Sequence, residues 1–350
     1  MTRWLPFLLG IPFPLAVGAF AQQPLASDLA ENWRASGEYF TWQSQGRDVK
    51  IFYACIGDPA KPAILMLHGF PTSSFDFHLL IQKLQPDFRI CTFDFPGYGL
   101  SDKPAAGYRY TLGEDAEITR YFILNIAKLK EFALLSHDRG DSVALAFLEL
   151  IENSDSGVRI THQFIINGNL YMSLAKLMEL QKLLLDPSTS AAALKQLSPP
   201  LLAAKLGTSL YTPPLEPADP EVLALASFFA YQSGTDVLPA TIQYLNERKQ
   251  FENEFLQALA RSSVPVTVAW GIHDMVAPVR VADYVWKTVL ESRKAPADFW
   301  LMPCGNHYVQ HDQPGELARI IRLELTGEPP AAPANLSSDR CSPVLAAYHE

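Results

Sequence analysis

Short apolar runs alternate with segments of helical spacing along most of the chain, and this alternation limits the architecture more than any other feature. The runs are rich in β-branched and aromatic residues, as buried strands are. They lie at residues 39–43, 49–56, 63–68, 88–95, 131–137, 158–167, 264–271 and 297–303. Strands that alternate with helices favour a parallel sheet between two helical layers. We therefore predict an α/β fold with a mostly parallel, eight-stranded sheet and helices on both faces.

One long stretch interrupts this alternation. Residues 170–250 contain no strand-like run, are rich in leucine and alanine, and carry several prolines between positions 187 and 220. This pattern is typical of short helices joined by turns. Because the stretch lies between two predicted core strands, we expect an inserted helical cap. The core then comprises residues 33–169 and 251–326, and the composition of residues 327–350 predicts a flexible tail.

The N-terminus has the organisation of a secretory signal peptide. A positive start with Arg3 precedes an apolar run that ends in small residues at Ala21. We expect cleavage after Ala21 and a periplasmic or secreted protein. No later run of about 20 apolar residues occurs, so no stable membrane insertion is expected after cleavage. The formal net charge of -9 argues against nucleic acid as a partner.

Four cysteines bear on the redox state of such an exported protein. Cys55, Cys91, Cys304 and Cys341 allow three disulfide pairings, and the sequence does not choose among them or exclude free thiols. The chain has no C-x-x-C motif and no Cys/His cluster. We therefore predict no metal site and no cofactor.

Titratable side chains follow four of the predicted parallel strands, at the edge where α/β sheets bind ligands. These residues are His68, Asp138, Asp274 and His307. The last three follow one another in the order nucleophile, acid, histidine, which is the order of one class of hydrolytic triads.

Asp138 lies in "LLSHDRGDSVA", which reads as a strand, a tight turn and a helix. Ser136 and Gly140 are small residues two positions before and after Asp138, as close strand–helix packing requires. The rival frame, "GDSVA", makes Ser142 the nucleophile. It would extend a buried strand through two charged residues and a glycine, which suits such a strand poorly. We favour Asp138, and a serine esterase that uses Ser142 is an alternative.

Five segments together resemble the α/β-hydrolase family: "HGFPTSS", "DFPGYGLSDKP", "SHDRGD", "WGIHDMVAP" and "GNHYVQHDQP". The aspartate at the turn resembles the branch that contains epoxide hydrolases and haloalkane dehalogenases. The resemblance extends over most of residues 33 to 327, and it implies the α/β-hydrolase fold.

The resemblance also implies a covalent mechanism. Asp138 would attack carbon and form an alkyl ester, and His307, oriented by Asp274, would activate the water that hydrolyses it. The backbone N–H groups of Phe70 and Arg139 are the expected oxyanion donors. The expected partners are water and a small apolar or amphipathic organic substrate.

The leaving group is less defined. Haloalkane dehalogenases resemble one another in a tryptophan directly after the nucleophile, whereas this chain has Arg139, and Phe70 stands where they often have asparagine. Arg139 resembles an arginine of fluoroacetate dehalogenases and would meet a substrate carboxylate. Epoxide hydrolases are the better match, because they donate hydrogen bonds to the ring oxygen from cap tyrosines. Tyr171, Tyr231 and Tyr244 are our candidates for that role.

Two histidines are expected to support the site. His68 is expected to brace the oxyanion loop, and His137 to pack beneath the turn that carries Asp138. Epoxide hydrolysis is thus our first hypothesis. A haloalkane or haloacid dehalogenase, and a non-enzymatic binding protein on a hydrolase scaffold, are further alternatives.

Overall fold

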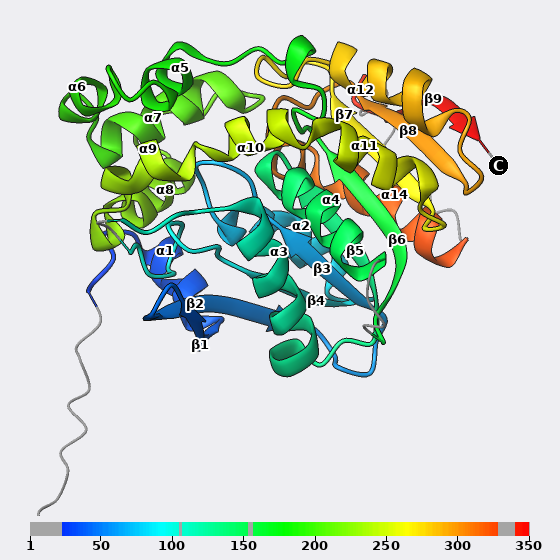
Figure 1. Ribbon diagram of the computed structural model, residues 1–350, viewed down its shortest axis with the longest axis horizontal. Helices are drawn as coiled ribbons and strands as arrows, with labels where there is room; N and C mark the ends of the chain where they lie inside the picture. Colours follow the sequence, from blue (N-terminus) through cyan, green and yellow to red (C-terminus); the bar gives the residue numbers. More distant parts are fainter. Residues whose placement is uncertain (1–22, 105–106, 153–156, 328–339, 350) are drawn as a thin grey trace, which may run out of the picture.

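A computed structural model describes residues 23–104, 107–152, 157–327 and 340–349, and the predicted signal peptide lies outside these ranges (Figure 1). The strands are β1 (Glu38–Ser44), β2 (Arg47–Ile56), β3 (Ala63–Leu67), β4 (Arg89–Phe93), β5 (Glu131–His137), β6 (Arg159–Ile166), β7 (Val266–Gly271), β8 (Ala297–Met302) and β9 (Val344–His349). They form one sheet in the order β1-β2-β4-β3-β5-β6-β7-β8-β9. Strands β3 to β8 are mutually parallel. Each of the eight apolar runs of the sequence forms one of the strands β1 to β8, as predicted.

The ninth strand corrects two expectations. Strand β9 pairs antiparallel with β8, from Leu301↔Val344 to Ala297↔His349. The sheet therefore has nine strands rather than eight, and the predicted flexible tail is wrong for residues 344–349. A disulfide between Cys304 and Cys341 holds the start of this segment close to the end of β8.

Helices cover both faces of the sheet. One face carries α3 (Leu112–Tyr121), α4 (Arg139–Glu152), α11 (Glu252–Arg261) and α12 (Arg280–Val285), and the other carries α2 (His78–Leu84) and α14 (Pro314–Thr326). Strands β3, β5 and β7 are almost fully buried, as expected of parallel strands between two helical layers.

The cap is helical throughout. It contains α5 (Glu179–Leu185), α6 (Ser190–Lys195), α7 (Pro199–Leu210), α8 (Pro220–Ala230), α9 (Leu238–Thr241) and α10 (Tyr244–Gln250). These helices gather on one side of the molecule (Figure 1). Ser198 and Asp219 begin α7 and α8 as N-caps, each followed by proline in the first turn. The prolines between residues 187 and 220 thus mark helix starts as well as turns.

The four cysteines form two disulfides, so the alternative of free thiols is wrong. Cys55 faces Cys91 directly across the antiparallel pair β2–β4. Within the part of the chain that the structure describes, no helix is both long and apolar enough to cross a bilayer.

Candidate active site

Asp138 lies on a sharp turn between β5 and α4. Its φ of +50° is in the left-handed region, which a non-glycine residue adopts only under local constraint. A Cβ at Gly140 would lie 2.2 Å from the carbonyl oxygen of Leu67, and one at Gly69 would lie 2.8 Å from the Asp138 Cβ. Glycine is therefore required at both positions, because the end of β3 and the loop after it pack directly against the turn. The strained backbone falls at Asp138, whereas Ser142 lies within the first turn of α4.

His307 and Asp274 meet beside this turn. Asp274 follows β7 and His307 follows β8, and His307 Nδ1 lies 2.9 Å from Asp274 Oδ2. The other carboxylate oxygen of Asp274 accepts the backbone N–H groups of Val276, at 2.7 Å, and Ala277, at 2.8 Å. Asp274 is thus fixed with one oxygen toward the histidine, which is the orientation that a supporting acid requires.

The charges of these groups are coupled. Burial alone would lower the pKa of His307, but the Asp274 carboxylate with its hydrogen bond, and then the nearby Asp138 carboxylate, outweigh it and raise the pKa to about 9. Burial raises the pKa of Asp138, and the charge of His307 opposes that rise. The Asp138 carboxylate and a protonated His307 therefore each favour the charged form of the other.

Two backbone donors converge on Asp138. The N–H group of Phe70 donates to Asp138 Oδ2 at 2.9 Å, and the N–H group of Arg139 also hydrogen-bonds the carboxylate. These are the two groups that the sequence indicated as oxyanion donors. They come from the loop after β3 and from the start of α4, so they are fixed by the core rather than by the cap.

His68 and His137 hydrogen-bond the loops around Asp138. His68 Nδ1 donates to the Gly69 carbonyl at 2.8 Å, and its Nε2 accepts the N–H of Phe95 at 3.1 Å. Burial lowers the pKa of His68 to about 3, so this ring is neutral. His137 Nε2 donates to the His307 carbonyl at 2.8 Å, and burial lowers its pKa as well.

The Arg139 side chain points into the protein. It forms an ion pair with Asp115 of α3 and is 1% exposed. Its guanidinium lies 4.8 Å from the Phe95 ring centroid, 5.0 Å from that of Tyr98 and 5.6 Å from that of Tyr244. Because Asp115 already supplies the anion, this arrangement gives no support to the predicted contact between Arg139 and a substrate carboxylate.

The three candidate tyrosines lie in different surroundings. Tyr244, at the start of α10, is buried, and its hydroxyl has no hydrogen-bond partner among the described residues. Burial and then the Asp138 charge raise its pKa. Tyr171 instead stacks on Tyr284 with centroids 3.9 Å apart. The Lys103 ammonium nitrogen lies over the ring of Tyr231, 4.9 Å from the centroid of that ring.

A cavity opens between the site and the cap. It encloses about 590 Å³, including space that is open to solvent, and His307, Phe70 and Val276 form its core side. Its cap side comes mainly from α5 and α7, with the aliphatic residues Leu180, Leu184, Leu202, Leu206 and Leu210. Such a cavity suits an apolar substrate. Within the described ranges, His, Cys, Asp and Glu side chains form no cluster of three or more that could bind a metal ion.

Two residues that sequence reasoning missed also belong to the site. Asn167 follows β6, and its amide nitrogen donates to Asp274 Oδ2 at 2.7 Å, while its oxygen accepts the N–H of Gly271 at 3.0 Å. Asp76 is a buried carboxyl group whose Oδ2 accepts the Thr72 hydroxyl. The position of Asn167 directly after a buried strand was the available signal for it. Asp76 lies in a short 3-10 helix, Ser74–Phe77, that follows no strand directly and carries no comparable pattern.

Comparisons with known proteins identify the family of this chain. A family model described as the alpha/beta hydrolase fold matches residues 62–159. The mesoderm-specific transcript homolog protein of Bos taurus is 31% identical over 276 residues, which are 77% of this chain and 81% of that protein. Epoxide hydrolase 3 of Xenopus tropicalis is 22% identical over 298 residues, covering 82% of this chain and 78% of that protein.

A solved structure extends the comparison to the fold. Haloalkane dehalogenase DbeA from Bradyrhizobium elkani matches with a TM-score of 0.66 at 20% sequence identity, covering 83% of this chain and 98% of that chain. At this identity the match speaks for the fold alone. The 31% identity over most of both chains, together with the family model, shows that this chain belongs to the α/β-hydrolase family and is a hydrolase.

Proposed function

We propose that the protein opens epoxides to diols through a covalent alkyl ester on Asp138. The observation that carries the proposal is the aspartate at the strained turn, with two backbone donors on its carboxylate and the His307–Asp274 pair beside it. The similarity to epoxide hydrolase 3 of Xenopus tropicalis supports this chemistry.

In the first step, an oxygen of the Asp138 carboxylate attacks a carbon of the epoxide ring. The carbon–oxygen bond of the ring breaks, and the ring oxygen takes the proton of the Tyr244 hydroxyl. The products of this step are a hydroxyalkyl ester on Asp138 and a tyrosinate. The buried, otherwise unpartnered hydroxyl of Tyr244 supports its role as the donor.

In the second step, His307 takes a proton from water, and the oxygen of that water attacks the ester carbonyl. The N–H groups of Phe70 and Arg139 stabilise the oxyanion, an effect worth about 3 kcal/mol per donor in other enzymes. The ester bond then breaks, the departing alkoxide takes the hydrogen that remains on the attacking oxygen and leaves as the diol, and Asp138 regains its carboxylate. The proton on His307 returns to the tyrosinate of Tyr244 through water, so the cycle closes.

The charge coupling described above fits the order of these steps. While Asp138 is ionised, it helps to keep the proton on His307. An ester on Asp138 is neutral, so this contribution to the pKa of His307 disappears once the first step is complete. A larger fraction of His307 is therefore unprotonated, and able to accept a proton from water, when the second step needs a base.

Labelling with oxygen-18 water tests the proposal. The purified protein turns over epoxides, haloalkanes and esters for many cycles, and the tryptic peptide from Glu131 to Arg139, "EFALLSHDR", is then fragmented. Label in the Asp138 carboxylate supports the ester route, and diol formation identifies the leaving group. Product without label contradicts it and points to Ser142 or to direct attack by water. The Asp138→Ala variant, which should form no diol, is the control.

A second candidate function is dehalogenation. The similarity in fold to haloalkane dehalogenase DbeA favours it, and the first step would be the same attack by Asp138 with halide as the leaving group. The absence of tryptophan in residues 139 and 170–250 argues against it. Release of halide from the haloalkanes in the same experiment would support dehalogenation. Absence of turnover on all three substrate classes would favour a binding protein on a hydrolase scaffold.

We also propose that the protein is exported. The signal-like sequence of residues 1–21 and the two disulfides support an oxidising compartment. Expression of the full chain in a Gram-negative host, followed by N-terminal sequencing of the periplasmic fraction, tests this. A mature chain that begins at Gln22 is expected, and an uncleaved chain confined to the cytoplasm would contradict export.

A further inference from the structure

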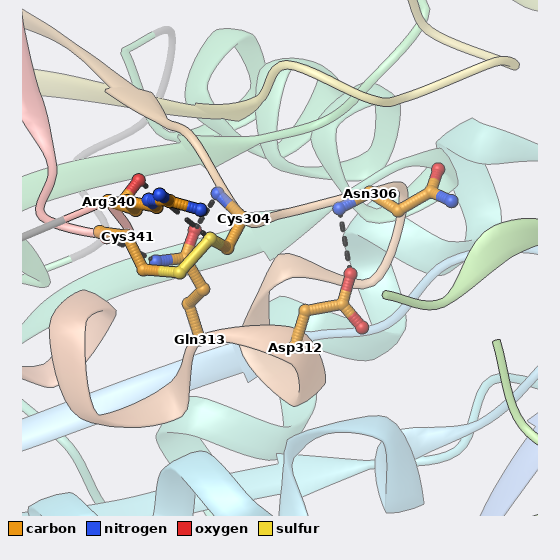
Figure 2. The surroundings of a disulfide bond; sticks show 6 residues. All are labelled: Cys304, Asn306, Asp312, Gln313, Arg340 and Cys341. Atoms are coloured by element: carbon orange, nitrogen blue, oxygen red, sulfur yellow. Dashed lines mark hydrogen bonds between the residues drawn. A yellow bond between two sulfur atoms is a disulfide. The ribbon is translucent and has the colours of Figure 1, made fainter. Parts of the chain in front are cut away.

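Asn306 directly precedes His307, and both its backbone and its side-chain amide form hydrogen bonds. Its backbone N–H donates to Asp312 Oδ2 at 2.7 Å, and its carbonyl accepts the Asn167 amide at 3.3 Å. Its side-chain oxygen accepts the N–H of His307 at 2.9 Å. In Figure 2 the Asn306 side chain points away from the disulfide, while its backbone nitrogen faces Asp312. These core contacts fix the loop that presents His307.

The side-chain amide of Asn306 leaves the core and reaches the cap. Its nitrogen donates to the carbonyl oxygen of Ser209 at 3.2 Å and lies 3.5 Å from that of Tyr211. The orientation of the amide is determined by its partners, because two carbonyl oxygens need a donor and the N–H of His307 needs an acceptor. Asn306 is only 7% exposed, so solvent does not readily replace these partners.

The cap segment that Asn306 holds also shapes the cavity. Ser209 lies in the last turn of α7, the helix that supplies Leu202, Leu206 and Leu210 to the cavity wall. Next to it, the ring of Tyr211 stacks on Tyr308 with centroids 4.6 Å apart. The end of α7 is thus joined to the histidine loop by the Asn306 amide and by the ring of Tyr211, which also packs edge-on against His311 with centroids 4.8 Å apart.

We propose that Asn306 is a positioning residue that couples the seating of α7 on the core to the alignment of His307. Its effect on catalysis rests on the proposed function above, in which His307 serves only the second step. Loss of the amide should therefore loosen α7 and the histidine loop together, and should slow ester hydrolysis while leaving the attack of Asp138 unchanged.

Hydrogen exchange tests the structural coupling without any substrate. The full chain is compared with two variants. Asn306→Ala loses both the side-chain oxygen that accepts from His307 and the side-chain nitrogen that donates to the cap. Asn306→Asp keeps an acceptor for the N–H of His307 but has no donor for the cap. In Asn306→Ala, amides at the end of α7 and around His307 should exchange at least about fivefold faster. In Asn306→Asp, only the amides at the end of α7 should exchange faster. Asn125→Ala, at an exposed asparagine, is the matched control and should change neither segment.

Single-turnover kinetics tests the catalytic consequence with an epoxide that the wild type hydrolyses. Intact-protein mass spectrometry follows the alkyl ester as it forms and decays. In Asn306→Ala its decay should slow about tenfold, because catalytic groups are sensitive to small misplacements, and its formation should stay within about twofold of the wild-type rate. The ester would then accumulate, which a general loss of folding does not produce.

The outcomes separate this inference from the proposed function. Unchanged exchange at α7 or at the histidine loop in Asn306→Ala overturns the coupling, whatever the kinetics are. Equal slowing of both steps overturns the positioning role. If the wild type turns over no epoxide, the proposed function fails, and the exchange experiment still decides whether Asn306 joins the cap to the histidine loop.

Discussion

The candidate reacting groups of this site differ in how strongly the fold constrains their positions. The core fixes Asp138, His307 and Asp274 through backbone strain, backbone donors and short hydrogen bonds. The ring of Tyr244 is buried, but no hydrogen bond from the described residues fixes its hydroxyl. The identity of the proton donor is therefore the part of the proposed mechanism that a single substitution tests best.

Removal of one hydroxyl makes that test. Tyr244→Phe keeps the ring that packs against Phe70 and Arg139, so the fold should be retained. Formation of the alkyl ester from an epoxide should slow about 100-fold, the lower end of general acid catalysis. Tyr231→Phe is the matched control, since the Tyr231 ring contacts the Lys103 ammonium group, and its rate should equal that of the wild type. Equal rates for all three proteins would exclude Tyr244 as the donor.

A buried histidine outside the site should make the fold sensitive to acid. Burial, with the Arg293 charge nearby, lowers the pKa of His162 to about 4, whereas an unfolded histidine has a pKa of about 6.5. Between these values the unfolded chain binds a proton that the folded chain does not, so stability falls as the pH falls from 6.5 toward 4. This one group should cost about 2 kcal/mol between pH 7 and pH 5.

His162→Gln removes that titration and keeps a donor for the Thr267 hydroxyl, which His162 Nε2 meets at 2.8 Å. Urea unfolding at pH 7 and pH 5 should then show an acid-induced loss that is smaller by about 2 kcal/mol than in the wild type. An identical loss in both proteins would mean that His162 is already protonated in the fold at pH 5.

Sequence patterns singled out Asp138, Asp274 and His307 as candidate residues that the structure brings together, because strand ends are readable from apolar runs. They did not rank the tyrosines. Tyr171, Tyr231 and Tyr244 all lie in a segment of short helices, where residue spacing does not determine which side chain faces the nucleophile. Asn167 and Asn306 were missed because an asparagine after a strand is also an ordinary turn residue.

At the scale of elements, β9 is the feature that local patterns did not predict. The segment is short and follows a proline-rich sequence. We expect its pairing with β8 to depend on which cysteine forms a disulfide with Cys341. That choice depends on tertiary structure, since four cysteines allow three pairings. The two disulfides that form span 36 and 37 residues, so chain entropy alone gives each a similar effect of about 4 kcal/mol.

The two disulfides should nevertheless respond differently to removal. Cys55 and Cys91 join strands in the interior of the sheet order, whereas Cys304 and Cys341 hold the edge strand β9. In Cys304→Ser/Cys341→Ser, the paired amides of β8 and β9 should exchange faster than in the wild type, with the remaining sheet protected. In Cys55→Ser/Cys91→Ser, β9 should stay protected and the urea midpoint should fall. Unchanged β9 exchange in the first variant would show that strand pairing alone holds it.

Over the whole molecule, the alternation of apolar runs and helical segments predicted the core and the place of the cap. The packing of the cap on the core was not predictable, because α7 and α10 reach the site through contacts far apart in sequence, such as that of Asn306 with Ser209. The substrate cavity lies between these two parts. Its size, and hence the range of substrates, is therefore a property of the assembled molecule.

A larger side chain on the cap should narrow that range. Leu206 of α7 is buried in the cavity wall, whereas Leu201 of the same helix is 41% exposed and lies outside it. Leu206→Trp should lower kcat/KM for a long-chain epoxide at least about tenfold relative to a short one, because added volume in the cavity costs about 1–3 kcal/mol of binding. Leu201→Trp should leave the ratio of the two kcat/KM values unchanged. If both variants change the ratio equally, the long chain does not bind between α7 and His307 but reaches Asp138 by another route.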